Sequence, residues 1–406
     1  MTTQTALAAF PPSREDGLAR LKDFVPQAGR DYATRRNFDL GQGAHDNVSC
    51  LSPYLRHRLV TEEEVLNAVL SKHSRSEAEK FIQEVFWRTY FKGWLEMRPP
   101  VWGGYWSELT FAWDQVQTQS GLRRAWEEAC RGETGIECFD AWAHELVETG
   151  YLHNHARMWF ASIWIFTLNL PWALGADFFL RHLCDGDPAS NTLGWRWVAG
   201  LQTPGKTYLA RASNIRKYTE DRFHPKWQLA GEAPAVNGSE NPAPMAAPDG
   251  DRLDPASPCV FLLHEDDLSP GWLFDLGLEP EASATLDTTG RMSMLTPAEH
   301  VSAFKSRAIA DAVARHEDRL GPVTSGLSDA KAIVDWARDH GASRIVTSYA
   351  PVGPTADLLR EIEGIEVVRP LRAFDARAWP YATKGFFKFK DKIPELLGEL
   401  RGLRVA

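Results

Sequence analysis

Cysteine is scarce in this chain, and no cysteine motif is present. The 406 residues include five cysteines, at positions 50, 130, 138, 184 and 259, and none belongs to a CxxC pair. An odd and dispersed set builds neither a disulfide framework nor the ligand spacing of a zinc or iron–sulfur site. We therefore expect reduced thiols, a cytoplasmic protein and no bound metal.

Long apolar runs and a basic leader are also missing. The first residues, MTTQTALAAF, have no basic stretch ahead of an apolar core, and no window approaches the roughly 20 apolar residues of a membrane-spanning helix. The formal net charge of −9 argues against binding of polyanions by the whole surface. We expect a soluble protein that does not bind membranes and is a monomer.

Tryptophan, in contrast, is abundant. Twelve of the sixteen tryptophans precede residue 226, so the excess belongs to one domain. Helical periodicity covers residues 14–36, 61–70, 76–97, 121–131, 139–149 and 152–166, whereas the Pro99-Pro100 pair predicts a break followed by aromatic-rich loops up to Trp113. Because strand-like alternation is missing throughout, residues 1–228 are predicted to form an all-α domain.

The composition changes after residue 228. Residues 229–258 are rich in Pro, Ala, Gly, Asn and Asp, which predicts an interdomain linker. In residues 259–406, the β-rich runs VFLLHEDD, SATLDT, RIVTSYA and IEVVRPL alternate with helical patterns at 297–315, 328–339 and 355–362. This alternation predicts an α/β domain with a Rossmann-like parallel sheet. His264 to Asp267 follow its first strand, where ligands of such sheets tend to lie; a polar strand end without a ligand is the alternative.

Two stretches of the helical domain combine charge with aromatic surroundings. Arg157 lies in the apolar run LHNHARMWFASIWIF, and a buried arginine needs a partner because an unpaired buried charge costs several kcal/mol. Asp185 and Asp187, in DGDPASNTLGWRW, are the available carboxylates. Helical spacing places Asn154 and Met158 on the face of Arg157. An ordinary buried ion pair that fixes helix packing is the alternative interpretation.

Further chemistry is expected on the helix at 76–97. Glu84, Trp87 and Arg88 share one face by their i, i+3, i+4 spacing, which offers an acceptor, a stacking plane and a cation to one surface. A core tryptophan beside a solvated ion pair is the alternative.

Seven segments in order resemble the helical FAD-binding domain of the DNA photolyase and cryptochrome family. They are FPPSREDGLARLKDFV, YATRRN, SCLSPYL, FIQEVFWRTYF, TGYLHNHARM, Trp172 and DGDPASNTLGWRW, spread over about 200 residues. The second domain looks like the α/β antenna domain of that family, which normally precedes the flavin domain, so the order is swapped here. FKFKDKIPELL resembles the segment that usually closes that α/β domain. The alternative is an unrelated flavodoxin-like appendage.

The resemblance implies a cofactor, FAD, and the residues that hold it. Tyr32 with Ser49, Cys50, Leu51 and Ser52 would bind the phosphates, although Val48 stands where the family often has Thr. The other implied cofactor-binding residues are Phe81, Arg88, Arg157, Asp185, Gly186, Asp187 and Asn191. Arg157 and Asp185 would form a salt bridge against the flavin ring, and Asn191 would face flavin N5 and favour its protonated, reduced form.

The resemblance also implies repair of cyclobutane pyrimidine dimers in ultraviolet-damaged DNA, driven by light and by electron transfer from reduced FAD. The implied catalytic residues, which would form the lesion pocket, are Glu84, Trp87, Asn154, Met158 and Trp197. Met158 favours the cyclobutane dimer because relatives that act on the (6-4) photoproduct typically have His there. Arg36 and His155 are the implied DNA-binding residues, and Trp195 and Trp172 the implied electron-transfer residues.

Several departures leave alternatives open. His155 replaces a common arginine, and the distal relay tryptophan aligns near Gln119, for which Trp113 or Trp126 are substitutes. These departures favour a cryptochrome-like FAD photoreceptor without repair activity as the alternative function. A second antenna chromophore is possible, but its identity is not indicated by LLHEDDL. A metal or nuclease site at His153-Asn154-His155 is a weak third hypothesis, because histidines at i, i+2 face different ways on a helix.

Overall fold

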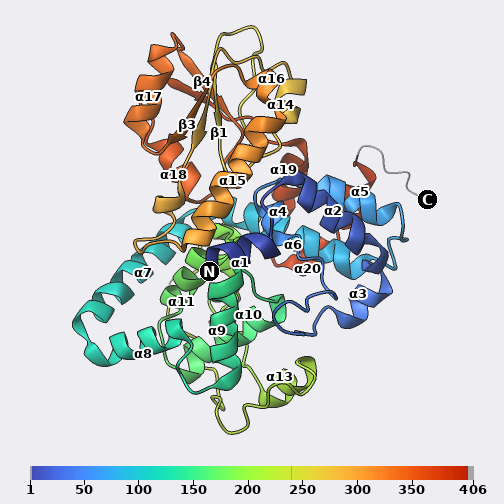
Figure 1. The fold of residues 1–406 in the computed structure, drawn as a ribbon, viewed down its shortest axis with the longest axis vertical. Helices are drawn as coiled ribbons and strands as arrows, with labels where there is room; N and C mark the ends of the chain where they lie inside the picture. The colour runs from blue at the N-terminus through green and yellow to red at the C-terminus, as the bar shows by residue number, and fades with distance from the viewer. Residues whose placement is uncertain (1, 239, 401–406) are drawn as a thin grey trace.

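The structure, a computed structural model, describes residues 2–238 and 240–400, which form a helical part and a smaller part built on a parallel sheet (Figure 1). The elements of the helical part are α1 (Thr2–Ala9), α2 (Arg14–Phe24), η1 (Val25–Gln27), α3 (Arg30–Arg35), α4 (Ser52–Arg56), α5 (Glu62–Leu70), α6 (Glu79–Glu96), α7 (Pro100–Thr118), α8 (Ser120–Arg131), α9 (Glu137–Thr149), α10 (Asn154–Ser162), η2 (Ile163–Thr167), α11 (Trp172–His182), α12 (Pro188–Val198) and α13 (Ala212–Tyr218). The described residues before 229 contain no strand, as predicted.

Side-chain caps explain where several of these helices begin. Thr61 and Glu64 form a capping box at the start of α5, and the Asp187 carboxylate accepts from the Ser190 N–H at the start of α12. Both arrangements satisfy backbone N–H groups that the first helical turn leaves without a partner. Asp187 therefore has a structural role at the start of α12.

The prediction of loops after Pro99-Pro100 was wrong. Pro100 is the first residue of α7, which continues for 19 residues to Thr118. Proline is tolerated in the first turn of a helix, where its missing N–H would have had no intrahelical acceptor. The pair starts a helix here instead of ending all regular structure.

The second part contains a five-stranded sheet in the order β3-β2-β1-β4-β5, and all pairs are parallel. Its strands are β1 (Val260–Leu263), β2 (Ser283–Leu286), β3 (Val323–Leu327), β4 (Arg344–Thr347) and β5 (Glu366–Val368). Its helices are α14 (Gly271–Asp275), η3 (Thr289–Arg291), α15 (Glu299–Arg315), α16 (Glu317–Leu320), α17 (Ala330–Asp339), α18 (Pro354–Arg360), α19 (Ala373–Ala378), η4 (Trp379–Tyr381), α20 (Phe386–Lys390) and α21 (Ile393–Gly398). The sequence indicated four of the strands. It did not indicate β3, whose residues VTSGL are polar and half-exposed at the sheet edge.

The two parts share one continuous hydrophobic core. The described residues of 229–258 contain no helix or strand, yet this segment is hydrogen-bonded to both parts, through Met245 to Met97 and through Asp251 to Arg369. The C-terminal helices α19 and α20 pack on α6, and in Figure 1 the red α20 lies among the blue helices of the helical part. Helices α19 and α20 therefore complete the helical part, while the domain boundaries stay a prediction.

Among residues 2–238 and 240–400, no helix combines the length and the apolar character that crossing a bilayer would require.

Candidate functional site

Arg157 and Asp185 form the expected ion pair. The Arg157 Nη2 donates to Asp185 Oδ2 at 2.8 Å, and the guanidinium Nε donates to the Leu152 carbonyl at 2.8 Å. Burial raises the pKa of Asp185, but the charge and hydrogen bond of Arg157 outweigh burial and leave it below its usual value. Asp185 is therefore a carboxylate held ionised inside an apolar environment.

Polar atoms without a partner surround this pair. Asp185 Oδ1 and Arg88 Nη1 are buried and have no hydrogen-bond partner among the described residues. An unsatisfied buried polar atom costs about 1–3 kcal/mol, so such atoms in one neighbourhood indicate a place for a ligand with both donors and acceptors. A flavin has both, and the residues present fit it.

Asp187 has a different environment from Asp185. Its Oδ2 lies 3.5 Å from the Lys92 Nζ, 3.7 Å from an Arg88 nitrogen and 3.9 Å from the Arg56 Nε. Burial raises the pKa of Asp187, but these three cations outweigh burial and depress it. The sequence offered both aspartates as partners of Arg157; the structure assigns only Asp185 to it.

Asn191 is oriented by a backbone carbonyl. Its Nδ2 donates to the Ala176 carbonyl oxygen at 2.8 Å. A carbonyl only accepts, so the amide nitrogen must face Ala176 and the Oδ1 must point elsewhere. The residue therefore presents an acceptor on its free side, as required to accept from a protonated ring nitrogen.

The loop at Ser49–Ser52 precedes a short helix. Cys50 adopts a left-handed backbone conformation with φ of 49°, which is uncommon for a residue with a side chain. The Ser52 hydroxyl lies close enough to Asp185 to lower the pKa of that carboxylate. Because α4 spans only five residues, any phosphate binding here depends on hydroxyls and loop N–H groups more than on a helix dipole. Leu51, 1% exposed, anchors the loop in the core.

Tyr32 and Phe81 are in contact, although they come from different helices. Their ring centroids are 5.1 Å apart at 86°, and Phe24 packs against both rings. Both predicted cofactor residues are largely buried. Gly186 stands between Asp185 and Asp187 in the sequence. A Cβ at this position would approach the Leu180 carbonyl oxygen to 3.0 Å, so the site is too tight for a side chain.

The five predicted lesion residues reach solvent from three helices. Glu84 and Trp87 lie on α6, Asn154 and Met158 on α10, and Trp197 on α12, which packs on both of the others. All five side chains are exposed or half-buried, and Trp197 is 38% exposed. Among the described residues, no hydrogen bond or ring contact joins the α6 pair to the other three.

Glu84 combines exposure with desolvation. Its side chain is 41% exposed, yet desolvation by surrounding protein raises its pKa, while the charges of Arg36 and Lys80 lower it. Glu84 is therefore a carboxyl that contacts solvent and also lies close to the Arg36 cation.

Arg36 and His155 differ in availability. The Arg36 Nε is 3.9 Å from Glu84 Oε1, and the side chain is 24% exposed. His155 is engaged inside the protein: Nδ1 lies 2.9 Å from the Asn37 carbonyl and Nε2 lies 3.4 Å from the Tyr208 hydroxyl. Burial lowers the pKa of His155, so at neutral pH the residue adds no cation to this face. A phosphate contact would have to break one of these bonds.

One of the two predicted electron-transfer residues, Trp172, contacts an aromatic cluster that the sequence analysis did not identify. Trp195 and Trp172 are both 3% exposed, and no ring contact joins them among the described residues. The Trp172 ring lies 5.9 Å from the Tyr105 ring, which in turn contacts Trp102 and Trp106. The proposed substitutes, Trp113 and Trp126, contact each other, and neither has a ring contact with Trp172. Tyr105 is thus the aromatic neighbour of Trp172, and the YW pair within α7 would have suggested it had that stretch been predicted as helix.

The carboxyl end of β1 is closed by protein. Asp266 pairs with the Arg56 Nη1 at 2.5 Å, Glu265 with the Lys305 Nζ at 2.9 Å, and Asp267 lies 3.8 Å from Arg58. All three carboxylates are at most 5% exposed. These ion pairs favour the interpretation as a structural strand end, because Asp266 joins the sheet to α4 and Glu265 joins it to α15.

One histidine–carboxylate cluster has the proximity of metal ligands. Single ligand atoms of Asp39, His45 and Glu145 lie within 4.8 Å of one another. The His45 Nε2 is 2.6 Å from Glu145 Oε1, and Asp39 accepts from Trp142 and Arg222. The His45 Nδ1 is buried and has no hydrogen-bond partner among the described residues. The prediction of no metal stays a prediction.

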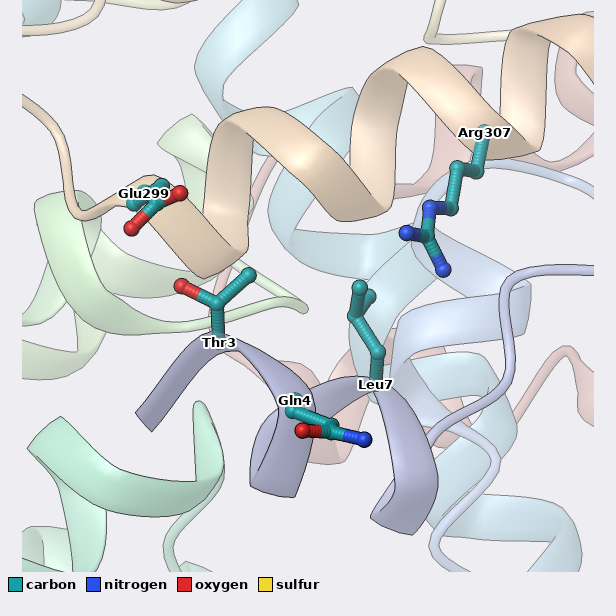
Figure 2. Close-up of a pocket in the computed structure, with 5 residues that line it drawn as sticks. All are labelled: Thr3, Gln4, Leu7, Glu299 and Arg307. Carbon is teal, nitrogen blue, oxygen red and sulfur yellow. The ribbon is translucent and has the colours of Figure 1, made fainter. Parts of the chain in front are cut away.

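Two surface hollows include none of the predicted cofactor and lesion residues in their walls. One, of about 420 Å³, is lined by Thr3, Gln4, Leu7, Glu299 and Arg307 between α1 and α15 (Figure 2). Figure 2 shows Glu299 and Arg307 at separate points along α15, and none of the predicted site residues is present. The other, of about 370 Å³, includes Trp172 and Glu108 in its wall. The Glu108 Oε2 accepts a hydrogen bond from the Trp172 indole at 2.5 Å. Only the second hollow touches a predicted residue.

Comparison with known proteins gives this helical arrangement a class. Residues 81–227 match the family model described as the FAD binding domain of DNA photolyase. The deoxyribodipyrimidine photo-lyase of Synechococcus sp. is 30% identical over 257 residues, which cover 58% of this chain and 51% of the relative. That of Alkalihalophilus pseudofirmus is 32% identical over 200 residues, which cover 48% of this chain and 39% of the relative. A solved bacterial class III photolyase from Agrobacterium tumefaciens has a TM-score of 0.44 at 27% identity, covering 53% of this chain and 45% of that one.

Within the helical part, residues 81–227 are similar to the FAD-binding domain of DNA photolyase. Through this part the chain resembles the photolyase/cryptochrome family. It spans about half the length of the curated relatives that it matches, and the match supports FAD as the cofactor.

Proposed function

We propose that this protein uses FAD and blue light to repair cyclobutane pyrimidine dimers in DNA. The observation that carries the proposal is Glu84: a carboxyl 41% exposed beside Arg36, with Trp87 three residues along the same helix and a buried Arg157–Asp185 pair in the same part. The name of the relatives, deoxyribodipyrimidine photo-lyase, supports the same reaction.

FAD, when bound, supplies under blue light the electron that splits the dimer and then returns. The chain's own residues bind the cofactor and orient its ring. The Arg157–Asp185 pair offers a flat guanidinium and a free carboxylate oxygen to the ring, and Asn191 offers an amide oxygen. Arg88 offers an unsatisfied N–H.

On the side of the lesion, Glu84 accepts a hydrogen bond from the edge of a pyrimidine, and Trp87 and Trp197 provide stacking planes. Asn154 and Met158 line the opposite wall from α10. Extrusion of the damaged bases from the duplex is the general behaviour of enzymes of this kind. Arg36, next to Glu84, is the phosphate contact of this pocket.

We also infer that the sheet part is the antenna domain of this family in swapped order. Its five parallel strands follow the helical part in the chain, and α20, from FKFKDKIPELL, docks on α6. Buried ion pairs occupy the edge of the sheet at the end of β1.

A photoreceptor without repair activity is the second candidate. Two observations favour it: His155 is neutral and internally bonded, and one face of Trp87 is covered by Phe386. In that case light changes the protein or its partners, and DNA remains unrepaired.

The test is incubation of the purified protein with a dimer-containing oligonucleotide under blue light and in darkness, with repaired product measured in each. Product only under blue light is expected. Equal product in both, or none from flavin-loaded protein, contradicts repair. Protein that releases nothing yellow on denaturation contradicts both candidates.

A further inference from the structure

Helix α20 attaches the C-terminal end of the chain to the proposed lesion pocket. The Phe386 ring stacks on Trp87 with centroids 3.6 Å apart and planes inclined by 13°. Tyr90 packs edge-on against Phe386, and its hydroxyl donates to the Lys384 carbonyl at 2.9 Å. One face of Trp87 is thus covered by a residue almost 300 positions later. Tyr90 and Phe91 also contact the ring, which stays half-buried.

The next residue points away from the protein. Phe387 is 80% exposed, although a ring of this size normally gains about 1.5–3 kcal/mol from burial. Lys384 and Lys388 on either side are exposed. Neither has an acidic partner among the described residues, whereas Lys390 pairs with Glu79 and Lys392 with Glu395. An exposed aromatic ring between two unpaired cations therefore directly follows Phe386, the residue that stacks on Trp87.

This combination matches single-stranded nucleic acid. Proteins bind such strands by stacking bases on aromatic rings and by placing cations along the phosphates. Arg36 and Lys80 flank Glu84 close by, since both lower its pKa. A second copy of this chain fits less well, because a symmetric contact would bring the same lysines together.

Resting on the proposed function, we propose that the segment Gly385–Lys390 binds the DNA strand beside the lesion. Phe387 stacks on an unpaired base next to the extruded dimer, and Lys384 and Lys388 contact the adjoining phosphates. Phe386 is a positioning residue that holds Trp87, and through it the pocket wall. The C-terminal part of the chain thereby contributes directly to recognition of damaged DNA.

Binding in darkness tests this surface without requiring repair. The flavin-loaded full chain is titrated into fluorescent dimer-containing single-stranded oligonucleotide, and anisotropy gives Kd at several salt concentrations. Phe387→Ala is expected to raise Kd about fivefold or more, because stacking of one base contributes about 1–3 kcal/mol. Phe387→Trp is expected to retain the affinity, since it keeps a stacking plane.

Matched controls separate this effect from general ones. Phe111→Ala removes another exposed ring, 65% exposed on α7, and Lys331→Glu reverses an exposed charge on α17. Both are expected to leave Kd unchanged. Lys388→Glu is expected to weaken binding and to reduce the slope of log Kd against log salt by about 0.7, the value for one phosphate of a single strand.

Each outcome has one meaning. If Phe387→Ala and Lys388→Glu bind like their controls, the proposal is overturned, even where blue light still repairs the dimer. If both variants weaken binding but no repair occurs, this surface stands and the repair reaction falls. If the wild type self-associates and Phe387→Ala abolishes the association without changing Kd for DNA, the surface belongs to a second copy and the proposal is overturned.

Discussion

Replacing Asp185 by Asn should separate the buried ion pair from everything else in the site. The substitution keeps the size of the side chain and removes its charge. Arg157 then keeps its bond to Leu152 and its position 5.4 Å over the Tyr151 ring, but it loses the carboxylate that neutralises it.

The magnitude follows from burial. Removing one partner of a buried ion pair destabilises a protein by about 3–5 kcal/mol, because the other charge is left without compensation. The Arg157 side chain is 23% exposed, whereas that of Asp185 is 1% exposed. Since some solvent reaches the guanidinium, we expect the lower end of that range, about 3 kcal/mol.

Two measurements on one preparation check the prediction. Urea unfolding of the flavin-free protein, followed by circular dichroism, gives the free energy of unfolding. Denaturation of the protein as purified releases its flavin, whose absorbance gives flavin per chain. We expect both quantities to fall in Asp185→Asn.

Asp335→Asn is the matched control, since Asp335 pairs with Lys331 on the surface, where the two side chains are 51% and 85% exposed. Exposed pairs contribute about 0–1 kcal/mol, so this variant should resemble the wild type. Asp185→Asn protein with wild-type flavin content and an unfolding free energy like that of Asp335→Asn would refute our account of the pair. A loss of stability with full flavin content would restrict Asp185 to the fold.

Four further predictions concern single residues. Glu84→Gln should keep its flavin and bind dimer-containing DNA about tenfold or more weakly, since hydrogen bonds to charged groups contribute about 1.5–3 kcal/mol; unchanged affinity would remove Glu84 from the pocket. Asn191→Ala should keep its flavin but reoxidise faster in air, as stopped-flow absorbance would show, and wild-type kinetics would contradict the orientation that we describe. Trp172→Phe should slow photoreduction of the flavin, whereas Trp113→Phe should not; the reverse result would move the electron path to Trp113 on α7. Burial raises the pKa of Glu96 to about 7, so its contribution to stability is present below about pH 4.5 and is lost as pH rises through 7, by about 3 kcal/mol. Glu96→Gln should flatten that dependence in urea unfolding between pH 5 and 8, and a slope equal to the wild type would refute it.

The sequence by itself determined most of the helices, four of the five strands and the need of Arg157 for a partner. These properties depend on local periodicity and on the cost of an unpaired buried charge, and both can be evaluated within about ten to thirty residues of chain. Where local signals were ambiguous, as at Pro99-Pro100, the prediction failed, because the same dipeptide can end one helix or begin another.

Only the tertiary structure decided how distant residues share the site. The sequence offered two aspartates to Arg157, and packing gave Asp185 to it and Asp187 to Lys92, Arg88 and Arg56. Packing also placed Phe386 on Trp87. Such contacts join residues that no periodic pattern relates, because their distance in space is set by how whole helices pack and is independent of their separation along the chain.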